Sequence, residues 1–88
     1  MSQHEESIPW FWLRGADGAA RALVGARHQA GLTQAQAAAR LHMDRTTLLN
    51  MEAGRNLTVN RFLDLFNWMG YDLIAVPRGA QVTVDTIR

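Results

Sequence analysis

The residues with the clearest potential for chemistry lie between positions 31 and 54. This segment reads as two short helices separated by a tight turn, and the second helix carries small polar side chains and one arginine on its outward face. Arginine, asparagine and threonine side chains form hydrogen bonds with the edges of DNA bases. Two helices joined in this way are how a protein presents a helix to the major groove, so the segment indicates a DNA-binding surface.

Catalytic and metal sites are not indicated anywhere in the chain. The three histidines, His4, His28 and His42, share no spacing with carboxylates that resembles a metal site or a general base. No nucleophile stands beside a base, and no glycine-rich phosphate loop occurs. Cysteine is absent, which excludes disulfides and thiolate metal sites and suits the cytoplasm. We therefore expect a cytoplasmic protein that is not an enzyme and holds no cofactor or metal.

Composition and charge point to one small domain with a basic face. The 88 residues suffice for one domain with a thin hydrophobic core. No apolar run approaches the roughly 20 residues of a membrane span, and the N-terminus lacks the features of a secretory signal. The formal net charge is only +1, but residues 18–62 carry six arginines and two acidic residues, which favours one basic face. A domain this small without disulfides often completes its core by dimerising.

The first helix is expected to run from Asp17, as its N-cap, to Ala30. Gly31 would supply the left-handed residue that ends it. One face of this helix has the spacing of buried positions, namely Leu23, Ala26, Arg27 and Ala30.

Three further helices are predicted to begin with the same device, an N-cap residue flanked by an apolar pair five residues apart. The N-caps are Thr33, which forms a capping box with Gln36, then Asp44 and Thr58. The apolar pairs are Leu32 with Ala37, Met43 with Leu48, and Leu57 with Phe62. The last helix is expected from about Thr58 to Met69, with Gly70 ending it. Its apolar stripe consists of Phe62, Leu65, Phe66 and Met69.

Both ends of the chain differ from this helical centre. Residues 1–7 are polar and expected to be disordered, whereas residues 8–13 form an apolar, aromatic run that is more strand-like than helical. Residues 71–77 have the pattern of a strand with a proline at its edge, and residues 81–85 alternate like a second, weaker strand. An isolated two-stranded ribbon is marginal in water, so a strand this apolar requires a partner.

Trp10, Phe11 and Trp12 have two interpretations. In the first, which we favour, they pack on the helices or add a strand to the C-terminal ribbon. In the second, part of this aromatic patch forms a docking surface for a partner protein together with Leu63 and Trp68.

The stretch from Leu23 to about Leu73 resembles the lambda-repressor/Cro-type helix-turn-helix family, also called the Xre group. The matching residues are Arg27, Gly31, Leu32, Thr33, Gln34, Ala38, Leu48, Glu52, Ala53, Gly54, Met69 and Gly70. The sequence departs from the family pattern at His42, where glycine is usual, and at Leu49, where serine is frequent. Histidine tolerates a left-handed backbone better than most residues, so the turn is expected to form.

The resemblance implies a mainly α, lambda-repressor-like domain of four to five helices with a short C-terminal β-strand extension. We therefore expect an N-terminal segment over residues 1–16, partly disordered and apolar at 8–13. A helix-turn-helix domain would follow over residues 17–70, and a β-strand dimerisation tail over residues 71–88.

The resemblance also assigns roles to individual residues. By family position, the DNA base contacts would be Arg45, Thr46, Thr47 and Asn50. The DNA phosphate contacts would be Gln34, Arg55, Asn56, Thr58 and Arg61. Arg27 and Glu52 would form a partly buried ion pair that supports the fold, and Asp44 would be a helix cap because phosphates repel a carboxylate.

A narrower resemblance is to HipB-type antitoxins, in which a strand directly after the helices pairs with the same strand of a second subunit. The dimer strand would then be Leu73, Ile74, Ala75 and Val76. This implies a homodimeric repressor of a palindromic operator, acting as antitoxin and autoregulator of a HipA/HipB-like toxin–antitoxin operon and sequestering a kinase-type toxin. The alternative is a stand-alone Xre-type regulator with no toxin partner.

Overall fold

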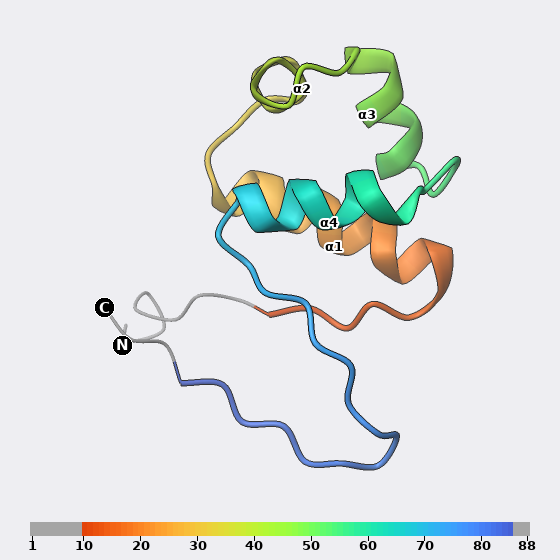
Figure 1. The fold of residues 1–88 in the computed structure, drawn as a ribbon, viewed down its shortest axis with the longest axis vertical. Coiled ribbons are helices and arrows are strands. Elements are labelled where there is room, and N and C mark those ends of the chain that lie inside the picture. The colour runs from red at the N-terminus through yellow and green to blue at the C-terminus, as the bar shows by residue number, and fades with distance from the viewer. Residues whose placement is uncertain (1–9, 86–88) are drawn as a thin grey trace.

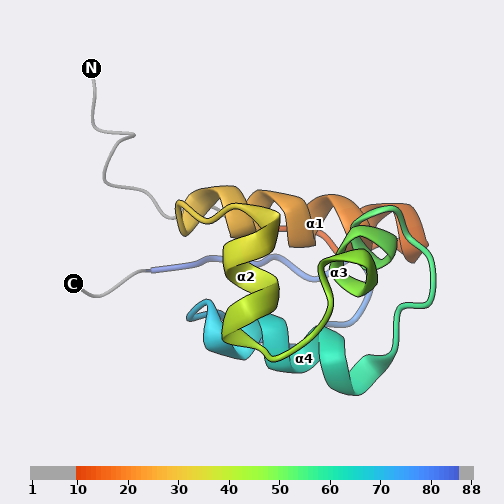
Figure 2. The ribbon, with the colours of Figure 1, turned by 90° about the horizontal axis from the view of Figure 1, so that it is seen from above.

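The computed structural model describes residues 10–85 and contains four helices in that range (Figure 1). They are α1 (Gly15–Gln29), α2 (Gln34–Arg40), α3 (Arg45–Glu52) and α4 (Val59–Trp68). Helices α1 and α4 pack against each other across the middle of the molecule, and α2 and α3 together cover one side of this pair (Figure 2). The predicted mainly α fold is confirmed.

The turn between α2 and α3 has the conformation that the sequence predicts. His42 has a φ of 54°, so it adopts the left-handed backbone that the turn requires. The amide of Met43 donates to the Ala38 carbonyl at 3.0 Å, and the His42 amide donates to the Ala39 carbonyl at 3.2 Å. These two hydrogen bonds satisfy carbonyls at the end of α2 and direct the chain into α3.

Helix α2 begins with the predicted capping box. The Thr33 hydroxyl accepts a hydrogen bond from the Gln36 amide at 3.1 Å, and the Gln36 side-chain oxygen accepts one from the Thr33 amide at 2.9 Å. Asp44 and Thr58 occupy the predicted N-cap positions of α3 and α4, but neither side chain makes a capping hydrogen bond.

The predicted start of the first helix was wrong. Its N-cap is Arg14, which has the extended backbone that this position requires, and the helix begins at Gly15. Asp17 lies inside the first turn, where its carboxylate is next to the positive end of the helix dipole. At the other end, Gly31 has a φ of 74° and terminates the helix as predicted. Ala30 is exposed rather than buried because it lies beyond the last helical residue.

The core is formed by alanines and Leu23 of α1, alanines of α2, and larger residues of α3 and α4. Its buried members are Ala22, Leu23, Ala26, Ala37, Ala38, Leu48, Met51, Leu65 and Phe66. The alanines allow the helix backbones to approach closely, and Phe62 and Met69 pack at the edge of the cluster as the predicted stripe requires. Most of the apolar residues predicted to flank the N-caps also pack against it, including Leu32, Met43 and Leu57.

The aromatic segment before α1 divides into a packed residue and two exposed ones. The Phe11 ring lies directly on Gly25 of α1, filling the space that a Cβ atom would need, and its centroid is 5.9 Å from that of Tyr71. Phe11 therefore packs on the helices as favoured. Trp10 and Trp12 contact each other edge-to-face, and both are about half exposed. Residues 10–13 form no strand; residues 1–9, including the rest of the predicted strand and disordered segment, lie outside the described residues.

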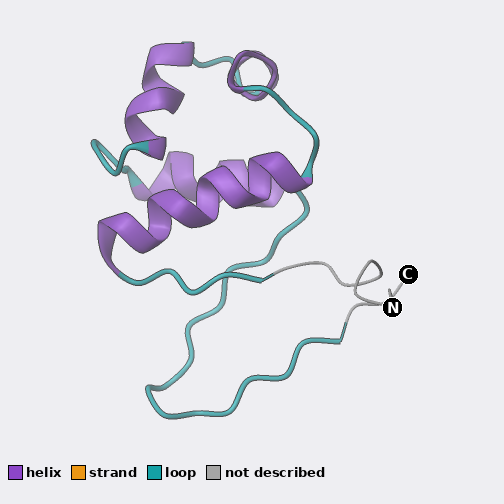
Figure 3. Ribbon diagram, turned by 180° about the vertical axis from the view of Figure 1, so that it is seen from behind, coloured by secondary structure: helices purple, strands orange, loops and turns teal. Residues whose placement is uncertain are grey.

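The predicted strands at 71–77 and 81–85 do not form within residues 10–85 (Figure 3). Over this tail the backbone bonds between described residues are Tyr71 N–H to Phe66 at 2.9 Å and Ala80 N–H to Pro77 at 3.1 Å. A strand needs a second strand alongside it, and the two legs of this tail diverge after the turn at residues 78–79. The predicted strands therefore do not form because the tail has no strand to pair with within residues 10–85.

The ring of Tyr71 anchors the start of this tail to the helices. It packs edge-to-face on Phe66 at 5.8 Å, and its buried hydroxyl has no hydrogen-bond partner among the described residues. Burial raises the pKa of this hydroxyl above its ordinary value, so the group is uncharged at neutral pH. None of the helices in residues 10–85 has both the length and the apolar character to cross a membrane.

Candidate DNA interface

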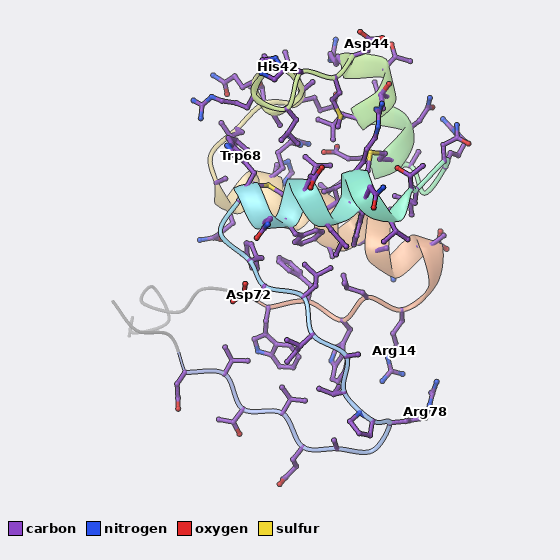
Figure 4. All side chains as sticks on the ribbon, in the orientation of Figure 1. Arg14, His42, Asp44, Trp68, Asp72 and Arg78 are labelled. Atoms are coloured by element: carbon purple, nitrogen blue, oxygen red, sulfur yellow. The ribbon has the colours of Figure 1, made fainter. Side chains whose placement is uncertain are left out.

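Helix α3 has one face in the core and one face in solvent. Leu48 and Met51 are fully buried in the core, where α3 packs against α1 and α2. On the other face of α3, the side chains of Arg45, Thr46 and Leu49 are exposed, and Asn50 is partly exposed. The α2–α3 turn and the start of α3 lie at one end of the molecule, opposite the C-terminal tail (Figure 4). This end is therefore open to a large partner.

An ion pair between α1 and the end of α3 fixes the orientation of α3. The Arg27 Nε donates to Glu52 Oε2 at 2.6 Å, and Arg27 Nη2 donates to Glu52 Oε1 at 3.1 Å. A third guanidinium hydrogen bond reaches the Leu32 carbonyl at 2.9 Å. The two side chains retain only 11% and 5% of their exposure, so this bidentate pair is largely removed from solvent. Its residues are the two that the family resemblance assigned to structure.

The ion pair extends through Gln34 to Arg45. The Gln34 amide nitrogen donates to Glu52 Oε1 at 3.0 Å, and the Gln34 amide oxygen accepts from Arg45 Nη2 at 3.4 Å. Because a carboxylate only accepts hydrogen bonds, Glu52 sets which way the Gln34 amide faces and leaves its oxygen toward Arg45. The exposed guanidinium at the first turn of α3 is therefore positioned by a chain of contacts that begins in the core.

Sequence reasoning missed this role of Gln34. It assigned Gln34 to phosphate contact, whereas the side chain lies between Glu52 and Arg45. These partners are 18 and 11 residues away along the chain, so no local sequence pattern indicates the contact.

The other predicted phosphate contacts lie after α3. Arg55 Nη2 donates to the Asn50 side-chain oxygen at 3.3 Å, and the Arg55 amide donates to the Asn50 carbonyl at 2.8 Å. Asn56, with a left-handed φ of 52°, and Thr58 are exposed in the same loop. Arg61 is exposed on α4 and lines a small hollow of about 180 Å³ with His42 and Asp64. The structure thus brings Arg55 to the base-contact candidate Asn50 and places Arg61 beside the α2–α3 turn.

No group of three or more His, Asp or Glu side chains in residues 10–85 has the arrangement of a metal site.

Two helices joined by a tight turn, with a polar exposed face on the second, define the helix-turn-helix class of fold. The family model described as a helix-turn-helix domain matches residues 15–68, more than half of the chain. The protein belongs to this family, whose members are typically DNA-binding rather than enzymatic, and membership supports a DNA-binding regulator. The search of curated proteins found no match.

The ion pair leads to a prediction about stability. Arg27→Met leaves the Glu52 carboxylate buried without its partner, so the variant should lose about 3–5 kcal/mol of unfolding free energy. The double variant Arg27→Met/Glu52→Met removes both charges and should recover most of this loss. Urea denaturation followed by circular dichroism measures both. Arg21→Met, an exposed arginine of the same helix, is the matched control and should change stability by less than about 0.5 kcal/mol. A double variant as unstable as the single one would contradict the assignment.

Proposed function

We propose that this protein is a sequence-specific transcriptional repressor that binds a palindromic operator as a homodimer in the cytoplasm. The observation that carries the proposal is the exposed face of α3, on which Arg45 donates to Gln34, whose amide in turn donates to Glu52. A side chain that is positioned before binding loses less conformational entropy on contact with DNA. Repression follows where the operator overlaps a promoter.

Base recognition is assigned to the exposed face of α3. Arg45 contributes a planar fork of donors that matches the O6 and N7 acceptors of guanine, and Asn50 pairs with adenine. Thr46 and Thr47 contact bases as smaller hydrogen-bonding groups. Arg55 supports the assignment for Asn50, because its hydrogen bond to the side-chain oxygen limits the rotation of the amide.

Phosphate contacts position the protein on the duplex without reading its sequence. They are assigned to the backbone of Gln34 and to Arg55, Asn56, Thr58 and Arg61. Each arginine that neutralises a phosphate releases counterions, so binding becomes weaker as the salt concentration rises.

Dimerisation is assigned to the C-terminal tail, with Leu73, Ile74, Ala75 and Val76 as the pairing strand. The tail has no helix or strand, and the large apolar side chain of Ile74 is 77% exposed in the single chain. Pairing with a second copy would cover it. Pairing with the tail of a second copy supplies the hydrogen bonds that the described chain does not provide. Because the tail and α3 lie at opposite ends of the molecule, this pairing leaves both α3 helices uncovered. They would then enter successive major grooves about 34 Å apart.

The more specific role is that of a HipB-type antitoxin that neutralises a kinase-type toxin. The resemblance of residues 68–78 to that branch supports it, together with the exposed apolar side chains of Leu63 and Trp68 on α4. A stand-alone repressor has no need for such a surface beyond α3 and the tail. Without a toxin, the protein is a stand-alone regulator of the Xre type.

Arg45→Ala should weaken binding to the operator about fivefold to 150-fold per half-site, since one bidentate contact to guanine is worth about 1–3 kcal/mol. The operator is obtained by selection from random-sequence duplexes, and binding is measured by fluorescence anisotropy. Arg14→Ala is the matched control: it removes the same charge at the N-cap of α1, away from the start of α3, and should alter affinity less than about twofold. Full affinity and selectivity in Arg45→Ala would reject the base-reading role.

Ile74→Glu should convert the dimer into a folded monomer, because it places a charge in the pairing face without disturbing the core. Sedimentation velocity at micromolar concentration measures the change, and Val59→Glu, an equally exposed position on α4, should remain dimeric. A wild-type protein that sediments as a monomer would contradict dimerisation through the tail.

For the antitoxin role, the test protein is a kinase-type product of the gene adjacent to that of the repressor. Arg45→Ala/Asn50→Ala should still neutralise its toxicity on co-expression, because DNA reading and toxin contact use different surfaces. Leu63→Glu/Trp68→Glu should lose neutralisation while retaining operator binding. Unchanged toxicity in the presence of the wild-type protein would reject the antitoxin role and favour the stand-alone regulator.

A further inference from the structure

Leu49 is the one large apolar side chain on the exposed face of α3. It is 41% exposed, whereas its neighbour Leu48 is almost completely buried. Leu48 and Met51 already supply the contacts that attach α3 to the core. Burial of apolar surface is favourable, and Leu49 leaves much of its side chain in contact with water in the free chain.

The position of Leu49 makes its exposure informative. Residues four apart on a helix are neighbours on the same face, so Leu49 follows Arg45 by one turn. Thr46, three residues earlier, is also its neighbour on this face, whereas Met51, two residues later, lies on the opposite side of the helix in the core. The apolar group therefore adjoins Arg45 and Thr46, two of the side chains proposed above to contact bases.

The major groove contains one apolar group that can match it. Among the base edges exposed there, only thymine carries a methyl group, at C5; the other positions present hydrogen-bond donors and acceptors. A leucine against cytosine or guanine would leave those polar groups without partners. We infer that Leu49 reads thymine through its C5-methyl group, an inference that rests on the proposed DNA-binding function.

The helix geometry also limits where this thymine lies. Four residues advance the helix by about 6 Å, and successive bases on one strand are about 3.4 Å apart. The thymine therefore lies within about two base steps of the guanine contacted by Arg45. The half-site should contain these two bases at that fixed spacing.

The experiment replaces single thymines of the selected operator with deoxyuridine, which removes only the methyl group. Wild-type protein should bind the substituted operator about fourfold more weakly per half-site, the value of one buried methyl group. Leu49→Ala should bind both operators with equal affinity, so that the two changes form a double-mutant cycle. Leu63→Ala, which truncates a leucine of 43% exposure on α4, is the matched control and should retain the preference for thymine.

A second substitution tests the methyl group in a different base. Where cytosine replaces the same thymine, 5-methylcytosine should restore part of the lost affinity for the wild type and none for Leu49→Ala. Thermal unfolding monitored by circular dichroism verifies that each variant is folded.

The inference would be overturned if the wild type bound thymine and deoxyuridine operators equally at every position, or if Leu49→Ala kept the preference. The repressor assignment would survive either result. It would also be overturned if Leu49→Ala disrupted the dimer or a protein complex without altering thymine preference. If selection enriched no sequence at all, the proposed function itself would fail, and the role of Leu49 would fail with it.

Discussion

The contact on which the rest of this structure depends is the ion pair between Arg27 and Glu52. It joins the last turn of α1 to the last residue of α3, and because little water reaches the two charges they compensate each other within the protein. One arginine satisfies two carboxylate oxygens and the Leu32 carbonyl, which also fixes the chain between α1 and α2. The angle at which α3 leaves the core is therefore set by directional hydrogen bonds as well as by apolar packing, which has no preferred direction.

The same ion pair is linked through Gln34 to Arg45, the residue proposed to contact guanine. Gln34 lies between the buried carboxylate and the exposed guanidinium of Arg45, so the side chain best suited to guanine is held by groups that also hold the fold together. The core beneath α3 is built from alanines on α1 and α2 and from Leu48 and Met51 on α3 itself. Every remaining side chain in the first six residues of α3 is at least partly exposed, which is the arrangement expected of a helix that contacts a second molecule.

Several features that arise from local interactions could be predicted from the residues themselves, whereas the long-range Arg27–Glu52 ion pair could be named only through the family resemblance. The Thr33 capping box and the left-handed residues His42 and Gly31 depend on neighbours within a few positions, and they formed as expected. The Gln34 contacts span 11 and 18 residues and have no local pattern. The strand propensity of residues 71–77 was read correctly as a pattern, but a strand exists only beside another strand. Asp17 failed as an N-cap because the extended backbone lies three residues earlier, at Arg14.

The central claim is that α3 enters the major groove in each half of an operator. Dimethyl sulfate footprinting of the selected operator tests it directly, because this reagent methylates guanine at N7 in the major groove and adenine at N3 in the minor groove. If α3 lies in the major groove, one guanine N7 is protected in each half-site, and the two protected guanines are about one helical turn apart. Protection of adenine N3 with every guanine N7 still reactive would place the protein in the minor groove and contradict the account.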